Sequence, residues 1–465
     1  MMTLSLAIRN LLRNRRRSLA TLLALAIGST AILLFGGYSS NIGYSMLTGY
    51  VRSGGHLQVQ FRDFFLYGSG NPTAYGIPDY ARIIDAIRDD EVLKKLVTVV
   101  TPTLQFGGIA GNYEAGVSRT VSGAGFIAKD VSQMRRWDEF RIGMDSPAYV
   151  LDGAPQDAAI VGVGLARVLL LCQQLRIADC PSPQADRTTA TGPALPADIA
   201  ALALLEAPAA KAAPATEPRI ELLAGHSRGS PNVAALRVLT AESQGFKELD
   251  EVAVVLQLEQ AQKLVYGRAK PQATSIMVQL ASTASIPQAT AQLQMLLARE
   301  APQRPLAVLD FVALNPFYVQ TLQLFDTIFG FIFVLIGGIV LFTVSNTMNA
   351  AVVERTVEIG TLRAVGLRQG GIRKLFVTEG FVIGCVGALV GALAAVVIAG
   401  AINLMGLTWL PPGSSEPLPL TLRVWGEWPM LIGTTLGLIV IAVASAWWPA
   451  WRAARLKIVE ALRHA

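Results

Sequence analysis

From Val352 to Gly380 the chain reads VVERTVEIGTLRAVGLRQGGIRKLFVTEG, and the rest of the sequence can be organised around this stretch. It directly follows an apolar run, so we expect an apolar helix to continue beyond that run as a charged stalk. The stalk is expected to end near Gly366, because glycine often ends a helix. A turn at Gly370-Gly371 then leads into a basic segment with apolar residues on one face.

Three charged side chains of this stretch, Glu354, Glu358 and Arg363, are available for contact with another protein. A hairpin lying at a membrane surface is the simpler alternative, and it would need neither the stalk nor this charge pattern. The stretch therefore favours a helical hairpin that docks a partner.

The composition is that of a membrane protein. Of the 465 residues 52% are hydrophobic and only 15% are charged, against about 25% charged in soluble domains. A compact soluble protein of this size lacks the charges to cover so much apolar surface, and the same figures exclude a disordered chain. The length allows about two to four domains, so we expect a sizeable water-facing part beside the membrane part.

Four windows without Asp, Glu, Lys or Arg are each long enough to cross a hydrocarbon core of about 30 Å as a helix. We predict transmembrane helices at residues 18–38, 325–347, 380–404 and 429–448. A fifth charge-free window, residues 271–298, is crowded with Gln, Ser and Thr, and unpaired amides are costly to bury in hydrocarbon. This window is predicted to lie in water.

The distribution of charge predicts the orientation. The segments before the first span, between the second and third, and after the fourth together hold 14 basic and 4 acidic residues. The long segment between spans one and two holds 24 basic and 26 acidic residues. Because basic loops stay on the cytoplasmic side, both termini are predicted to be cytoplasmic and the long segment to lie outside. The basic pI therefore reflects membrane topology, and nucleic acid is not an expected partner.

These patterns predict an α-helical membrane protein with four transmembrane helices, one plus three, and a large mixed α/β extracytoplasmic domain inserted between helices one and two. An amphipathic helix at the N-terminus is expected to lie along the inner leaflet, with a plain positive flank as the alternative. Helix one is expected to be an uncleaved anchor, with a cleaved signal peptide as the alternative. The predicted segments are the cytoplasmic amphipathic helix (1–17), helix one (18–38), the α/β domain (39–324), helix two (325–347), the cytoplasmic stalk and coupling helix (348–379), helix three (380–404), an outer loop (405–428), helix four (429–448) and a cytoplasmic tail (449–465).

Apolar periodicity predicts the elements of the α/β domain. Residues 181–218 are rich in Ala and Pro, cannot supply a core and are interpreted as a floppy insertion at a loop tip, with a docking arm as the alternative. Strands are expected at 56–61, 97–110, 113–123, 219–224, 233–241 and 251–258, and helices at 79–88, 159–171, 259–266 and 287–299.

No catalytic or metal-binding residue is predicted. Residues 225–229, GHSRG, fit the G-x-S-x-G motif of hydrolases, but the only later histidine, His464, is predicted on the other side of the membrane. We therefore interpret the motif as a turn. No lysine follows a glycine, so the sequence contains no Gly-Lys-[Ser/Thr] loop for ATP, and a separate chain is expected to supply ATPase activity.

The cysteines and glycines have structural interpretations. Cys172 and Cys180 flank a short segment on the predicted outer side, where an oxidising compartment would allow a disulfide, and two free thiols are the alternative. The spans hold no buried charged residue for a proton relay, which argues against ion-coupled transport. Three G-x-x-x-G pairs permit close helix packing: Gly380 with Gly384, Gly387 with Gly391, and Gly433 with Gly437.

Residues 346–380 resemble the FtsX/MacB-type (type VII) family of ABC transporter permeases. The pattern of this family is N-x-M followed by E-R-x-x-E-I-G-x-L-R-A-x-G. The ending PAWRAARLKIVEALRHA is similar to the family's tail, with Ile458 in place of the usual Pro. The start AIRNLLRNRRRS also looks like the family, and SGGHLQVQ after the first span resembles its lipoprotein-releasing, LolC/LolE-like branch. The pattern is matched at Asn346, Met348, Glu354, Arg355, Glu358, Ile359, Gly360, Leu362, Arg363, Ala364 and Gly366.

The resemblance implies a non-enzymatic permease of the bacterial inner membrane. Two copies, or two related subunits, would pair around a cytoplasmic ABC ATPase dimer that binds ATP and Mg, and a homodimer is the simplest assembly. ATP-driven closure would pass through the stalk to the periplasmic domain. The coupling residues that the resemblance implies are Glu354, Arg355, Glu358, Ile359, Gly360, Arg363, Ala364 and Gly366.

Extraction or export of a lipoprotein or lipid-like substrate is the leading function that the resemblance implies. A periplasmic carrier or adaptor would then be a further partner beside membrane lipids. Macrolide-exporter-like efflux from the periplasm is one alternative. A transmembrane signal transmitter of the cell-division type, which transports nothing, is the other.

Overall fold

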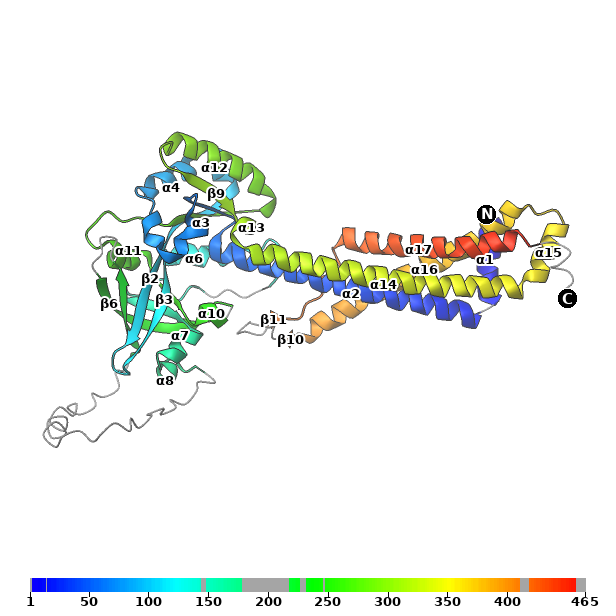
Figure 1. Cartoon of the computed structure of the whole chain (residues 1–465), viewed down its shortest axis with the longest axis horizontal. Coiled ribbons are helices and arrows are strands. Elements are labelled where there is room, and N and C mark those ends of the chain that lie inside the picture. The colour runs from blue at the N-terminus through cyan, green and yellow to red at the C-terminus, as the bar shows by residue number, and fades with distance from the viewer. Residues whose placement is uncertain are drawn as a thin grey trace, which may run out of the picture. The chain divides into compact units, whose positions relative to one another are not determined.

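The computed structural model describes residues 2–13, 15–143, 148–177, 217–225, 231–245, 247–409 and 418–456 (Figure 1). The chain divides into two compact units. The helical unit comprises Met1–Met46, Phe317–Trp409 and Leu418–Ala465, and the α/β unit comprises Leu47–Pro316 and Leu410–Pro417. Most of the predicted insertion, Cys180 and Ser227 of the G-x-S-x-G motif lie outside the described residues.

Four helices are long and apolar enough to cross a membrane by length and composition, namely α2, α14, α16 and α17. Each of the four predicted spans falls inside one of them. α2 also continues beyond the helical unit into the first residues of the α/β unit. The described elements are α1 (Met2–Arg13), α2 (Arg15–Gly54), α14 (Pro316–Glu354), α15 (Thr356–Ala364), α16 (Gln369–Met405), β10 (Thr408–Trp409), β11 (Leu418–Pro419) and α17 (Trp428–Ala454).

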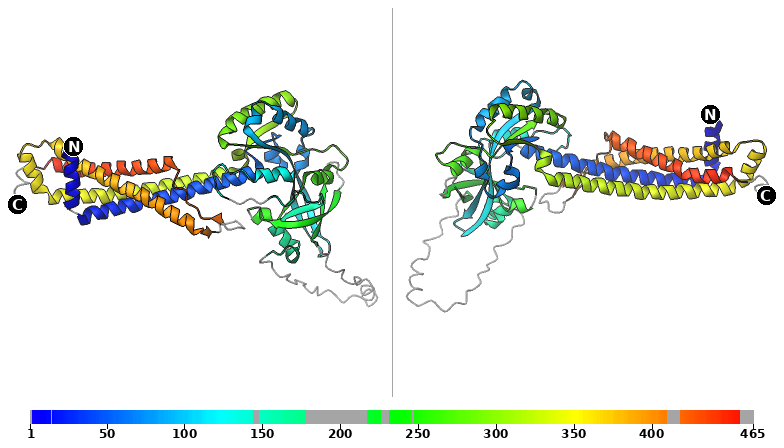
Figure 2. Two further views of the ribbon diagram at one scale, coloured as in Figure 1. Left: turned by 180° about the vertical axis from the view of Figure 1, so that it is seen from behind. Right: turned by 45° about the horizontal axis from the view of Figure 1, so that its top comes forward.

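Helices of the helical unit lie side by side (Figure 2), and small residues occupy the points where they pack most closely. A Cβ on Gly380 would lie 2.5 Å from the Cβ of Ala446, so α16 packs against α17 with no room for a side chain there. A Cβ on Gly391 would lie 2.5 Å from the carbonyl oxygen of Ala26 in α2. The Thr30 hydroxyl donates a 3.0 Å hydrogen bond to the Gly391 carbonyl across the same contact. Backbones this close allow the packing and polar contacts that hold helices together in lipid.

The other four glycines of the predicted pairs differ in their surroundings. Gly384 lies against Ala442 of α17, and Gly387 lies against Leu25 of α2. Gly437 faces the ring of Phe333 in α14, whereas an added Cβ on Gly433 would have nothing within 4 Å. The first two G-x-x-x-G pairs of α16 therefore face two different helices, and the pair in α17 uses only its second glycine.

The α/β unit is built on a nine-stranded sheet with the order β3-β7-β4-β6-β5-β2-β8-β1-β9. The strands are β1 (Leu57–Phe61), β2 (Val97–Asn112), β3 (Val117–Phe126), β4 (Ala158–Gly162), β5 (Arg219–Gly225), β6 (Pro231–Glu242), β7 (Ala253–Gln257), β8 (Ser275–Leu280) and β9 (Leu306–Asp310). The helices, including short 3-10 turns, are α3 (Phe64–Tyr67), η1 (Gly68–Gly70), η2 (Pro72–Tyr75), α4 (Tyr80–Asp89), α5 (Leu93–Leu96), α6 (Ala128–Met134), α7 (Val163–Val168), α8 (Cys172–Leu175), α10 (Lys247–Asp250), α11 (Leu258–Tyr266), η3 (Thr283–Ser285), α12 (Ile286–Glu300) and α13 (Phe311–Leu314).

The long strand β2 belongs to two lobes. Its first half, Val97–Thr103, pairs with β8, and its second half pairs with β3 and β5. Because β3 pairs with both β2 and β7, six strands of the second lobe close on themselves around one apolar core. The first lobe is a smaller sheet of β1, β8, β9 and the start of β2, whose core is completed by α4 and α12 (Figure 1).

The strands that enter and leave the α/β unit pair with each other. β1 follows α2, β9 precedes α13 and α14, and the two run antiparallel with Leu57 opposite Asp310. β1 also pairs with β8 on its other side. The two ends of the unit are therefore joined through adjacent strands of one sheet.

One predicted helix is wrong. Residues 159–171 were expected to be helical, but Ala158–Gly162 forms β4 between β6 and β7, and only Val163–Val168 is helical. All five residues of β4 are buried. A continuous apolar run carries no periodicity to separate a buried strand from a buried helix, which explains the error. The window at residues 271–298, predicted to lie in water, forms β8 and most of α12 in the α/β unit.

His56 is buried where α2 leads into β1. Gly55 has φ +76 and lies against the backbone of Val278, a position that only glycine occupies without strain. The next residue, His56, accepts a 3.0 Å hydrogen bond at Nδ1 from the Leu280 amide and packs edge-on against Trp137. Burial lowers the pKa of His56 from 6.5 to about 4, although the nearby Glu139 carboxylate raises it in part.

We expect acid to weaken the α/β unit through His56. Its folded pKa lies below its unfolded value, so the stability it contributes is present above pH 6.5 and is lost as pH falls towards 4. The loss should be roughly 2 kcal/mol at pH 4.5. Hydrogen exchange of the Leu280 amide between pH 7 and 4.5, corrected for intrinsic rates, measures it. His56→Asn keeps an acceptor without titrating, so an equal pH dependence in that variant would contradict the assignment.

Candidate functional site

Residues 352–380 form a hairpin that contains parts of three helices. α14 ends at Glu354, α15 runs from Thr356 to Ala364, and α16 begins at Gln369. Arg355 is the non-helical joint between α14 and α15, with φ −107 and ψ 16. Gly366 has φ +104, and its amide and that of Leu367 bond back to α15 carbonyls, so the stalk ends where the sequence predicts.

The predicted turn at Gly370-Gly371 is wrong. Both glycines lie in the first turn of α16, which begins after Arg368. The positive φ at Gly366 has already ended the stalk, and the segment Gly366–Arg368 completes the turn. A second turn four residues later is therefore unnecessary.

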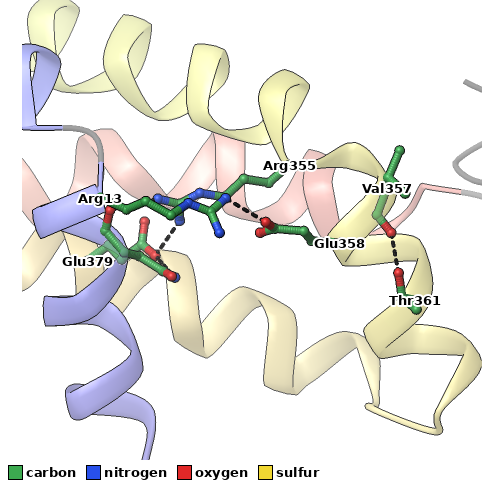
Figure 3. Close-up of polar contacts among 7 residues, drawn as sticks. Arg13, Arg355, Val357, Glu358, Thr361 and Glu379 are labelled. Carbon is green, nitrogen blue, oxygen red and sulfur yellow. Dashed lines mark hydrogen bonds and ion pairs between the residues drawn. The ribbon is translucent and has the colours of Figure 1, made fainter. Parts of the chain in front are cut away.

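A buried ion pair lies at the base of this hairpin (Figure 3). Arg355 Nη1 donates to Glu379 Oε1 at 2.9 Å, and the two residues are only 5% and 1% exposed. Arg355 Nη2 donates to the Asn10 carbonyl at 3.0 Å, and the Asn10 amide donates to Glu379 at 2.7 Å. The cluster therefore joins the α14–α15 joint, the third turn of α16 and α1.

Two ion pairs lie around this buried pair and are more exposed. Arg13 at the end of α1 pairs with Glu358 of α15, as Figure 3 shows. Arg17 at the start of α2 pairs with Glu354 at the end of α14. The side chains of Glu354 and Glu358 remain 47% and 48% exposed. The carboxylates predicted to contact another protein are thus paired within the chain and still accessible.

The remaining predicted coupling residues are divided between core and surface. Ile359 and Gly360 are buried, and Ile359 belongs to the apolar core of the helical unit. Arg363 donates a hydrogen bond to the Leu456 carbonyl just beyond α17. Ala364 and Gly366 are exposed at the end of α15. α15 is therefore tied to α1 through Glu358 and to the end of α17 through Arg363.

Sequence reasoning did not identify Glu379 and Asn10 as members of the site. Glu379 directly precedes the predicted helix three, and Asn10 lies within the predicted N-terminal amphipathic helix. α1 in fact turns Ala7, Asn10 and Leu11 inward, while Ile8 and Leu12 are exposed. A lone carboxylate at the start of a long charge-free helix, with an Arg on the preceding segment, is the signal that could have indicated the pair.

We expect the buried pair to dominate the stability of the hairpin. Arg355→Ala leaves Glu379 buried without its cation and should destabilise the helical unit by about 3–5 kcal/mol. Glu358→Gln removes only an exposed pair and should cost less than about 1 kcal/mol. The measurement is the thermal unfolding of both variants in detergent, monitored by hydrogen exchange of the α16 amides. Arg355→Met with Glu379→Leu should recover most of the loss, and equal melting temperatures for Arg355→Ala and Glu358→Gln would refute this ranking.

The structure describes two of the three cysteines. Cys172, at the start of α8, is disulfide-bonded, and Cys385 in α16 is a free thiol. Cys180, the predicted partner of Cys172, lies outside the described residues. The bridge between Cys172 and Cys180 stays a prediction.

Four long apolar helices, with a charged hairpin fastened by buried and exposed ion pairs, are typical of a membrane-embedded protein. Residues 327–458 match the family of the FtsX-like permease C-terminal domain. The chain therefore carries an FtsX-like permease domain, and this domain contains α15, α16, α17 and all of the predicted coupling residues.

Two curated relatives are similar to part of this chain. "Lipoprotein-releasing system transmembrane protein LolC" of Xylella fastidiosa (strain 9a5c) is 27% identical over 168 residues, which cover 34% of this chain and 40% of the relative. "Macrolide export ATP-binding/permease protein MacB" of Nitrobacter winogradskyi is 37% identical over 129 residues, covering 28% of this chain and 17% of the relative. The chain thus spans less than half the length of these relatives.

A solved structure, the periplasmic region of MacB from Actinobacillus actinomycetemcomitans, covers 57% of this chain and 94% of its own. Its sequence is 11% identical and its TM-score is 0.31. A score this low does not define a common fold.

Proposed function

We propose that this chain is the permease subunit of an ABC transporter of the bacterial inner membrane, with both termini in the cytoplasm and the α/β unit in the periplasm. The FtsX-like match over residues 327–458 carries the proposal, because it includes the whole docking hairpin. A cytoplasmic ABC ATPase dimer would bind ATP and Mg, and a second copy of the chain or a related permease would complete the membrane part.

In this proposal the hairpin receives motion from the ATPase and passes it into the bundle. The buried cluster of Arg355, Glu379 and Asn10 would move α15 together with α1 and the start of α16. α14 has 39 residues, whereas about 20 cross a bilayer, so it extends beyond the hydrocarbon core. Movement at Glu354 would thereby reach the other end of α14, at Pro316, where the chain leaves the α/β unit.

For the cargo we propose a lipoprotein or a lipid-like molecule, extracted or exported with the help of a periplasmic carrier or adaptor. Two observations support this choice. Apart from Asp326, the second residue of the predicted second span, the predicted spans contain no charged residue that could line an ion path. LolC, a transmembrane protein of a lipoprotein-releasing system, is among the similar proteins. The second candidate is macrolide-exporter-like efflux, which the higher identity to MacB over 129 residues favours.

Coupling can be tested by reversing and then exchanging charges. Glu358→Lys places a cation against Arg13 and should uncouple ATP hydrolysis from cargo release, with at least a tenfold fall in release per ATP, about 1.4 kcal/mol. The measurement is ATPase rate and release of lipoprotein or macrolide from vesicles containing the chain and its partner ATPase. The control is Arg13→Glu with Glu358→Lys, which restores an ion pair in the opposite sense.

The control distinguishes two origins of coupling. If the intrachain pair transmits force, the exchanged pair should regain most of the lost coupling. If Glu358 contacts the ATPase directly, the exchange should not help. Full coupling in the Glu354→Lys and Glu358→Lys double variant would show that this hairpin is not the coupling element.

The orientation is tested separately by thiol labelling of intact cells. Tyr113, at the tip between β2 and β3, is 85% exposed, so Tyr113→Cys should react from outside. Gln369→Cys, at the start of α16, should react only after the membrane is opened. Labelling of Gln369→Cys in intact cells would overturn the proposed topology.

A further inference from the structure

Tryptophans mark both ends of α17. Trp428 begins the helix, and Trp447, Trp448 and Trp451 follow near its end, all of them exposed. Trp428 and Trp447 are 19 positions apart, which is about 29 Å along a helix and close to the thickness of a hydrocarbon core. Tryptophan favours the boundary between lipid tails and headgroups. If α17 crosses the membrane as proposed, the cluster at its end would lie at the level of the lipid headgroups.

Arginines cover two of these rings. The guanidinium carbon of Arg373, from the second turn of α16, lies 5.2 Å from the centre of the Trp447 ring. That of Arg455, one residue beyond the end of α17, lies 3.8 Å from the Trp451 ring. Positions 447, 451 and 455 are four residues apart, so they form one ridge along α17. The start of α16 and the end of α17 lie at the same end of the helical unit (Figure 2).

The cations of this ridge differ in their partners from the arginines that fasten the hairpin. Arg13, Arg17 and Arg355 all pair with glutamates. Within the part of the chain that the structure describes, neither Arg373 nor Arg455 has an acidic partner. The same holds for their exposed neighbours Lys374 and Arg452. Four cations thus face solvent beside exposed indole rings.

We propose that Arg373, Arg455, Trp447 and Trp451 form a binding site for the headgroup of an anionic phospholipid. The guanidinium groups would contact the phosphate, which suits their forked donors, and the indole rings would lie beside the glycerol and upper acyl chain. Lys374 and Arg452 would add attraction at longer range. The inference rests on the proposed membrane placement of α17.

A second copy of the chain fits this ridge less well than a lipid does. A two-fold interface brings the same surface of each copy together, so the unpaired cations of one copy would face those of the other. An anionic headgroup neutralises them instead. The excess positive charge and the exposed tryptophan rings therefore favour an anionic lipid over a second copy of the chain.

The test is native mass spectrometry of the full chain, purified in mild detergent and offered equimolar phosphatidylglycerol and phosphatidylcholine. The wild-type chain should retain phosphatidylglycerol selectively. Arg373→Gln with Arg455→Gln should lower that selectivity roughly tenfold or more, since each cation near an anionic surface contributes about a fivefold factor. Arg373→Lys with Arg455→Lys keeps the charge but loses the forked donors, and should fall between the two.

The matched control is Arg9→Gln with Arg16→Gln, which removes the same charge from exposed positions of α1 and α2. Its selectivity should stay within about twofold of the wild type. Equal losses in both Gln variants, or no loss in either, would overturn the proposal, and so would loss of a dimer with unchanged lipid selectivity. Because the assay needs neither ATPase nor cargo, its result is independent of whether the chain transports anything, and the labelling of Gln369→Cys tests the membrane placement separately.

Discussion

A buried ion pair, Arg355 with Glu379, is the constraint on which the rest of the helical unit depends. Desolvating both charges is costly, and the cost is offset only while they contact each other and their hydrogen bonds are made. Arg355 makes this pair from the point where the chain leaves the regular helix between α14 and α15. Asn10 completes the cluster from α1 by binding both members. The break in the stalk and the N-terminal helix thus meet at one buried ion pair.

The ion pairs of the hairpin differ in burial: one is buried and the two around it are half-exposed. The inner pair cannot open without leaving a buried charge, so in the proposed function α1, the stalk joint and α16 would move as one piece. The outer pairs of Arg13 with Glu358 and Arg17 with Glu354 are half-exposed, and such pairs are worth little. Their carboxylates can exchange one cationic partner for another at small cost. A fixed core surrounded by exchangeable charges is suited to receiving force from a partner that binds and releases.

The sequence predicted elements whose signals are local. Charge-free windows located the four apolar helices, and Gly366 marked the end of the stalk because a helix ends where φ becomes positive. The ion pair of Arg355 with Glu379 was not predicted, because nothing near either residue specifies the other. β4 was taken for a helix because a fully buried strand shows no alternation. Local periodicity and turn chemistry are visible in one sequence, whereas partners that tertiary folding brings together are not.

The pairing of β1 with β9 has a consequence for how the chain is made and how it has diversified. The strand formed first in the α/β unit finds its neighbours only after β8 and β9 have been synthesised, more than 200 residues later. Until then the first lobe cannot close, and its exposed strand edge needs protection from aggregation. Once closed, the two strands bring entry and exit of the intervening chain to one place. Everything between them can then lengthen, shorten or be replaced as a cassette, while the helices that flank it keep their spacing.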